Sequence, residues 1–141
     1  MKVLVLGGFG FIGSHITKKL SKEGYEAIPA SRKNGVDLFD YKNFKNYLYD
    51  LKPDSIINCA ANVGSVNFVS EFSADVIFSN VQILINLYKA ISESCPKTKL
   101  SIHYQIAHIL VKATFKKKSI GFLEMFTIRF FHMAIQKEFY I

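Results

Sequence analysis

Four closely spaced glycines near the start of the chain have the spacing of a phosphate-binding turn. They follow a short apolar run, Lys2–Leu6. Gly8, Gly10 and Gly13 give G-x-G-x-x-G, while Gly7, Gly10 and Gly13 give G-x-x-G-x-x-G. A turn of this kind between a strand and a helix presents unpaired backbone N–H groups and the positive end of the helix dipole. We therefore expect it to bind a phosphate or pyrophosphate, the alternative being a glycine turn without a ligand.

A second candidate anion-binding group follows the next apolar run, Tyr25–Ala30. A nucleotide site that selects NAD places a carboxylate at this point for the ribose 2′-hydroxyl. The chain has Ser31-Arg32-Lys33 there instead. A guanidinium suits a 2′-phosphate because it donates bidentate hydrogen bonds. Arg32 thus favours NADP over NAD, and the alternative is that Arg32 is a solvated loop residue.

Apolar runs that alternate with helical patterns must position these groups. Ile12, Ile16 and Leu20 recur at helical spacing after the glycines, and Gly24 suits the end of that helix. Strands alternating with helices indicate an α/β fold, a Rossmann-type doubly wound parallel sheet that is truncated here. The predicted strands are Lys2–Leu6, Tyr25–Ala30 and Ser55–Cys59, and the predicted helices are Ile12–Glu23, Asp40–Leu51 and Val76–Ser92, the last with Ile83, Leu84, Leu87, Tyr88 and Ile91 facing inward.

From about Met1 to Leu100 the chain resembles the extended short-chain dehydrogenase/reductase family of sugar-nucleotide epimerases, dehydratases and reductases. Several motifs carry the resemblance in the family's order and spacing. They are the glycine motif Gly7–Gly13, the adenine-contacting segment Asp37–Asp40, the strand signature Lys52–Ala61, and the long-helix motif Asn80–Leu87. The segment Asn62–Ser65 is most similar to reductases of the GDP-fucose synthase type, which use NADP.

The resemblance implies a cofactor site, and with it a nucleotide-sugar substrate for the intact family. Asp37 would contact the adenine, although it could instead cap the next helix, a role that also suits Asp40. Small alanines after the third strand would let the backbone approach the cofactor ribose. The expected cofactor is NADP, with NAD as the alternative, and the predicted binding residues are Gly7, Gly10, Phe11, Ile12, Gly13, Arg32, Asp37, Leu38, Ala60, Ala61 and Asn80.

The catalytic residues that the family requires are missing from the sequence. Its chemistry uses a Ser or Thr and a Tyr-x-x-x-Lys pair, in which the tyrosine is the acid–base and the lysine lowers its pKa. The only such pair is Tyr41 and Lys45, which precedes the third strand and is interpreted as a surface coincidence. Tyr104 is followed four residues later by His108. We predict no catalytic residue, and the histidines and cysteines lack the spacing of a metal site.

Composition excludes several other classes of protein. The chain has 141 residues, enough for one domain, and half of them are apolar. Its net charge is +7, but the basic residues are scattered except for Lys116–Lys118, so a nucleic-acid partner is not expected. No segment approaches the roughly 20 apolar residues of a membrane span, and the opening run is too short for a signal peptide. Cys59 and Cys95 are expected to be reduced thiols, and the protein cytoplasmic.

The sequence changes character after about Leu100. The chain is predicted to divide into a dinucleotide-binding part, residues 1–100, and a divergent tail, residues 101–141. The tail has many aromatic side chains, and its apolar residues follow neither a helical nor a strand periodicity. We explain the change by a reading-frame shift near Leu100. The genetic code allows several codons for each observed residue. When suitable codons are chosen and read two bases late, they encode a serine-containing segment over Ser101–Gly121 and a Tyr-x-x-x-Lys over Phe131–Glu138. Sequencing the gene tests this hypothesis.

Three functions are consistent with the sequence. The first is an inactive dinucleotide-binding fragment of a nucleotide-sugar enzyme. The second is a genuine short NADPH-binding or redox-sensing module whose tail forms a homodimer interface, since exposed aromatic side chains mark interaction surfaces. The third, a basic nucleic-acid binder, rests on charge alone.

Overall fold

The computed structural model describes residues 1–102, which belong to one compact unit, Met1–His103. The elements alternate as the sequence predicts. In chain order they are β1 Lys2–Leu6, α1 Phe11–Lys22, β2 Glu26–Ala30, the 3₁₀ turn η1 Arg32–Asn34, α2 Tyr41–Leu51, β3 Ser55–Asn58, α3 Val66–Glu71, α4 Ser73–Ser94 and β4 Lys99–Ile102.

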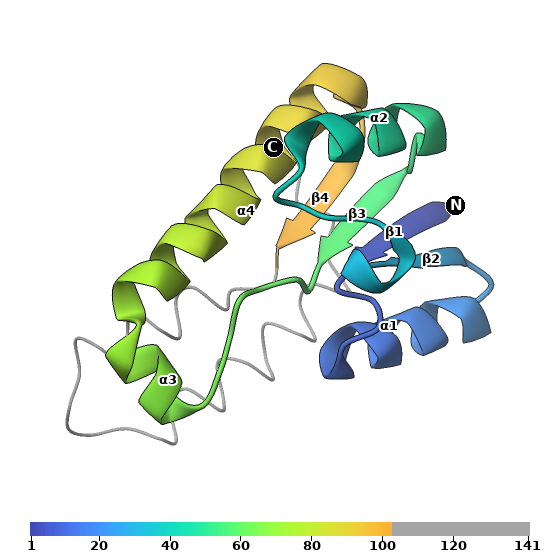
Figure 1. Cartoon of the computed structure of the whole chain (residues 1–141). Helices are drawn as coiled ribbons and strands as arrows, with labels where there is room; N and C mark the ends of the chain where they lie inside the picture. Colours follow the sequence, from blue (N-terminus) through green and yellow to red (C-terminus); the bar gives the residue numbers. More distant parts are fainter. Residues whose placement is uncertain (103–141) are drawn as a thin grey trace. The chain divides into compact units, whose positions relative to one another are not determined.

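The strands form one parallel sheet in the order β2-β1-β3-β4. Helix α1, which connects β1 to β2, lies on one face, while α2 and α4 lie on the other (Figure 1). From β1 the chain runs through α1 to β2 on one side, and later elements continue from β3 on the other side of β1. The switch point of the sheet therefore lies at β1, between β2 and β3. This arrangement is the doubly wound Rossmann type, in which ligands bind outside the carboxyl ends of the strands at the point of change.

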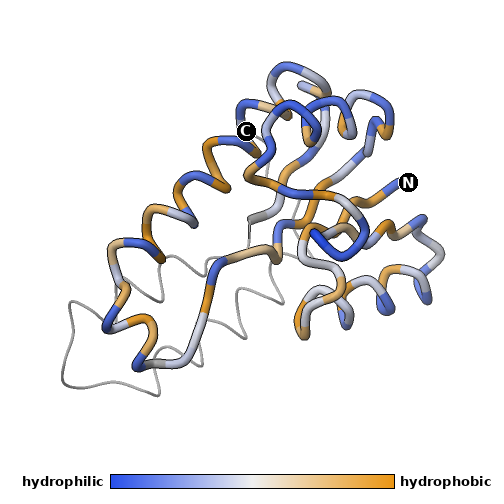
Figure 2. Tube along the Cα trace, viewed as in Figure 1, coloured by the Kyte–Doolittle hydropathy of each residue, from blue (hydrophilic) through white to orange (hydrophobic). Residues whose placement is uncertain are grey.

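The core lies between the sheet and the two helices α2 and α4. Leu4 and Ile56 from the strands pack with Phe44 and Leu48 of α2 and Leu87 of α4, and all five are almost completely buried. Val3 and Val5 alternate with Leu4 and are buried too, which is typical of a strand covered on both faces. Figure 2 shows apolar stretches along the strands and an alternation of apolar and polar stretches along α4.

Most predicted boundaries are confirmed within a few residues. The first helix ends at Lys22, and Gly24 follows in the left-handed conformation with φ of 84°. The inward direction predicted for Tyr88 is wrong, because the side chain is 47% exposed while its neighbour Leu87 is buried. The sequence patterns did not predict η1, α3 or β4, and α4 begins at Ser73 rather than Val76.

The division into residues 1–100 and 101–141 stays a prediction. Residues 103–141 lie outside the part that the structure describes, and with them lie the aromatic residues of the predicted tail and the dimer interface assigned to it. The first two residues of that tail, Ser101 and Ile102, are described and belong to β4. The frame-shift hypothesis concerns the same segment.

Candidate functional site

The glycine turn between β1 and α1 is closely packed against its neighbours. Gly7 has φ of 71°, and a Cβ atom there would lie 2.8 Å from the backbone of both Cys59 and Ala60. A Cβ atom at Gly13 would lie 2.2 Å from the carbonyl oxygen of Gly7. Real Cβ atoms do not approach backbone this closely, so these two glycines let strand, turn and helix come together.

Gly10 differs from these two glycines. Its φ of −77° is open to any residue, and an added Cβ atom would meet only the Gly7 carbonyl oxygen, at 3.2 Å. A contact of 3.2 Å is closer than usual, so alanine at Gly10 requires only a small shift of that oxygen, in contrast to Gly7 and Gly13. Gly8, which belongs to the first glycine template but not to the predicted binding set, has a packing role, because its Cβ atom would lie 2.6 Å from Pro29 Cβ.

The N-terminus of α1 carries unpaired donors. Gly10 is the N-cap and provides no side-chain cap, and the first turn holds no acidic residue. Within residues 1–102, the backbone N–H groups of Phe11, Ile12 and Gly13 have no hydrogen-bond acceptor. Three N–H groups without acceptors at the positive end of a 12-residue helix make this terminus a candidate anion-binding site.

The end of β2 is tied directly to this turn. The carbonyl oxygen of Ala30 accepts hydrogen bonds from the N–H groups of Gly7 and Gly8, at 2.8 and 3.2 Å. Arg32 follows Ala30 by two residues and is exposed. Its carbonyl oxygen accepts from the N–H of Gly35, while its guanidinium has no hydrogen-bond or ion-pair partner among the described residues. The structure thus brings Arg32 to the same edge of the sheet as the glycine turn.

The loop that carries Arg32 is held by its own side chains. Ser31 Oγ accepts from the N–H of Lys33 at 3.1 Å, and Asn34 Oδ1 accepts from the N–H of Ser31 at 2.8 Å. Asn34 Nδ2 also donates to the carbonyl of Pro29 at 3.1 Å. This reciprocal cap fixes the backbone on both sides of Arg32 while its guanidinium stays free.

The segment between η1 and α2 contains the predicted adenine contacts Asp37 and Leu38. Asp37 Oδ1 accepts from the N–H of Phe39 at 3.0 Å, so Asp37 forms a local turn. Asp40 is the N-cap of α2 and accepts from the N–H of Asn43 at 3.1 Å, which settles the capping alternative in favour of Asp40. The Leu38 side chain is buried in the core, but its N–H has no acceptor among residues 1–102.

The loop after β3 contains Ala60 and Ala61, which are half-buried. Two buried asparagines hold it. Asn58 Oδ1 accepts from the N–H of Ala60 at 3.0 Å, and Asn80 of α4 bonds the backbone of Asn62 through both Oδ1 and Nδ2, at 2.8 and 2.9 Å. The Asn80 side chain therefore contacts the loop itself. Sequence reasoning missed Asn58, although an amide at the end of a buried strand is a signal that was available.

Tyr41 and Lys45 lie on α2 beside Glu93 of α4. Lys45 Nζ lies 2.6 Å from Glu93 Oε2, and Lys89 Nζ lies 4.9 Å from the centre of the Tyr41 ring. Burial and the neighbouring Glu93 carboxylate raise the pKa of Tyr41 to about 12. An acid–base tyrosine needs a lowered pKa, and this environment shifts the pKa of Tyr41 in the opposite direction.

The described residues hold no cluster of three or more potential metal ligands. Cys59 and Cys95 are free thiols, and burial raises the pKa of Cys59 to about 11, which keeps that thiol protonated at neutral pH. None of the helices in residues 1–102 is both long and apolar enough to span a membrane. The cytoplasmic location remains a prediction.

A parallel sheet with a glycine turn, free helix donors and an arginine at its carboxyl edge defines a Rossmann-type nucleotide-binding class. The sequence model of the NAD dependent epimerase/dehydratase family matches residues 3–104. The chain belongs to this family, which is NAD(P)-dependent.

Similarity to known proteins supports the assignment to this family. The chain is 32% identical over 94 residues to GDP-L-colitose synthase of Yersinia pseudotuberculosis, an alignment that covers 67% of this chain and 30% of the relative. It is 30% identical over 86 residues to GDP-L-fucose synthase 1 of Arabidopsis thaliana, covering 61% and 27%. Among solved structures, UDP-glucose 4-epimerase of Thermus thermophilus in complex with NAD superposes with a TM-score of 0.60 at 30% identity, covering 71% and 36%. The chain therefore spans about a third of the length of the proteins it matches.

Proposed function

We propose that residues 1–102 form the NADP-binding part of a nucleotide-sugar oxidoreductase or epimerase of the GDP-fucose synthase kind. The observation that carries this proposal is the pairing of two anion-binding features at one edge of the sheet. One is the α1 N-terminus with its three unpaired N–H groups, and the other is the unpaired guanidinium of Arg32. A pyrophosphate and a ribose 2′-phosphate are the two anionic groups of NADP, and each finds a matching donor set here.

The remaining groups of the cofactor match the other predicted residues. The free N–H of Leu38 suits a ring nitrogen of adenine, and the Asp37 carboxylate, which uses Oδ1 for its turn, suits the exocyclic amine through its second oxygen. The short side chains of Ala60 and Ala61 leave their backbone accessible to a ribose. The proposed binding set is Gly7, Gly10, Phe11, Ile12, Gly13, Arg32, Asp37, Leu38, Ala60 and Ala61, with Asn80 acting through the loop that it contacts.

The bound cofactor would supply hydride transfer at its nicotinamide ring. The residues of this chain would bind the pyrophosphate, orient the adenine end and select the 2′-phosphate. Because the relatives named above are a GDP-L-colitose synthase and a GDP-L-fucose synthase, we infer that the substrate class is a GDP-linked sugar.

Thermal melting of the purified chain tests the binding function. A ligand that binds only the folded state raises the melting temperature by an amount that grows with the logarithm of its concentration relative to its Kd. At about 100 times the Kd, NADPH should add about 2.7 kcal/mol to the free energy of unfolding. NADH at the same concentration should add less, because it lacks the 2′-phosphate. A cooperative melt that neither nucleotide raises would contradict the proposal.

We further propose that the 141-residue chain has no turnover. The single Tyr-x-x-x-Lys pair of the sequence has a tyrosine whose pKa is raised to about 12, the wrong direction for an acid–base. A protein that binds NADPH but lacks the acid–base should leave the near-ultraviolet absorbance of NADPH unchanged when a GDP-linked 4-keto sugar is added. Oxidation of NADPH that depends on the sugar would overturn this second proposal and leave the first intact.

A further inference from the structure

The described residues bury only three polar side chains, and all three are asparagines. Asn58, Asn80 and Asn86 are exposed by 4, 4 and 7%. Burying an amide is costly unless its hydrogen bonds are satisfied. Each of the three bonds to backbone of a loop at the carboxyl edge of the sheet, and two of them come from α4.

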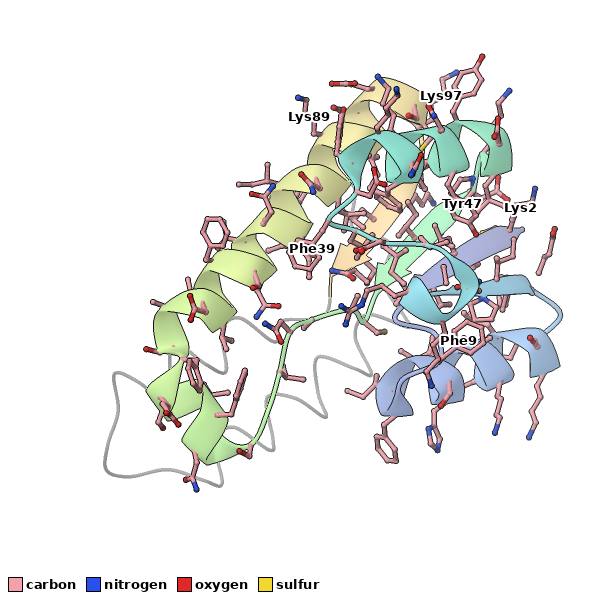
Figure 3. The ribbon with its side chains drawn as sticks, viewed as in Figure 1. Lys2, Phe9, Phe39, Tyr47, Lys89 and Lys97 are labelled. Carbon is pink, nitrogen blue, oxygen red and sulfur yellow. The ribbon has the colours of Figure 1, made fainter. Side chains whose placement is uncertain are left out.

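Asn86 holds the segment with the predicted adenine contacts. Its Nδ2 donates to the carbonyl of Leu38 at 2.8 Å and approaches that of Phe39 at 3.4 Å, while its Oδ1 accepts from Gln82 Nε2 at 2.9 Å. Figure 3 labels Phe39 where this segment approaches α4. Asp37 lies next to the anchored carbonyl. The position of Asn86 therefore fixes the backbone that presents the Asp37 carboxylate and the free Leu38 N–H.

Asn80 holds the other loop. Its Oδ1 accepts from the N–H of Asn62 at 2.8 Å, and its Nδ2 donates to the carbonyls of Asn62 and Val76, both at 2.9 Å. Asn80 and Asn86 lie six residues apart on one rigid helix, yet no described residue receives hydrogen bonds from both. Each amide thus acts on its own loop.

We propose that Asn86 and Asn80 are positioning residues that set the two ends of the nucleotide site independently. Asn86 orders the adenine end, and Asn80 orders the loop of Ala60 and Ala61 at the ribose end. This inference rests on the proposed NADP-binding function. Preorganised loops bind more tightly because less conformational freedom is lost on binding. Loss of either amide should therefore weaken only the ligands that its own loop contacts.

Matched substitutions of equal size test this division. Asn86→Leu and Asn80→Leu each replace a buried amide by an apolar side chain with the same number of heavy atoms. The ligands for calorimetric titration of the full chain are 2′,5′-ADP, which occupies only the adenine end, and NADPH, which occupies both. Asn86→Leu should raise the Kd of 2′,5′-ADP about tenfold, because the segment around Asp37 and Leu38 would then have to be ordered on binding. Asn80→Leu should change that Kd by less than about twofold and raise the Kd of NADPH about tenfold.

Two further measurements keep the test decisive. Gln82→Met removes only the donor to Asn86 Oδ1 at a solvent-accessible position of α4, and it should weaken 2′,5′-ADP in the same direction if Asn86→Leu does not fold. Hydrogen exchange without ligand should quicken at residues 36–40 in Asn86→Leu and at residues 60–63 in Asn80→Leu. Equal loss of 2′,5′-ADP affinity in both variants would overturn the inference. Failure of the wild-type chain to bind either ligand would instead refute the proposed function.

Discussion

Replacing Gly13 with alanine is expected to destabilise the fold by about 3 kcal/mol, because the added methyl group would overlap the backbone of the glycine turn. The Cβ atom would lie 2.2 Å from the Gly7 carbonyl oxygen and 2.8 Å from Gly8 Cα, and neither backbone atom can move without shifting β1 or α1. For a domain of this size, such a loss corresponds to a fall of roughly 10–20 °C in the melting temperature. Urea unfolding followed by circular dichroism measures the free energy directly.

Gly10→Ala is the matched control. It makes the same chemical change three residues earlier, at a backbone conformation that alanine adopts readily, with one contact at 3.2 Å. Its free energy of unfolding should stay within about 1 kcal/mol of the wild type. Its affinity for NADPH should fall about tenfold, since the methyl group occupies the approach to the α1 donors. A Gly13→Ala protein that unfolds with the wild-type midpoint would show that the turn is not packed as described.

The local part of this site could be predicted from the sequence. The glycines, the arginine after the second strand and the N-cap role of Asp40 depend on neighbours within a few residues, and their spacing carries that information. Asn86 could not be assigned a role in this way, because its partners Leu38 and Phe39 lie almost fifty residues earlier in the chain. Its burial would be a signal only if the inward face of α4 were known. The error at Tyr88 has the same origin, since an apolar pattern broader than one face does not show where the buried face ends.

The role of Asn80 shows a second limit. The family resemblance places this residue in the cofactor site, and within the described residues its amide makes three hydrogen bonds, to the backbone of Asn62 and Val76. A motif identifies a residue that matters to a site but does not say whether it touches the ligand or a loop. Only the hydrogen bonds of the folded chain distinguish these two cases.

Replacing Arg32 with glutamate is expected to reverse the cofactor preference. The Arg32 guanidinium has no partner among residues 1–102, and the cap formed by Ser31 and Asn34 fixes the backbone around it, so the substitution removes no described side-chain contact. It removes a bidentate donor for the 2′-phosphate and introduces repulsion. The Kd of NADPH should therefore rise about 100-fold, equivalent to about 2.7 kcal/mol. The Kd of NADH should change by less than about threefold, since a carboxylate accepts from the free 2′-hydroxyl.

Lys33→Glu separates a specific contact from the general effect of charge. It makes the same change in net charge at the next residue, which is exposed on the same 3₁₀ turn. If Arg32 binds the 2′-phosphate directly, Lys33→Glu should weaken NADPH by only a few-fold, and salt at about 0.5 M should abolish most of that effect because it screens exposed charges. The effect of Arg32→Glu should persist in salt, since it includes the loss of hydrogen bonds. Equal, salt-sensitive losses in both variants would mean that the basic loop attracts the nucleotide without recognising the 2′-phosphate.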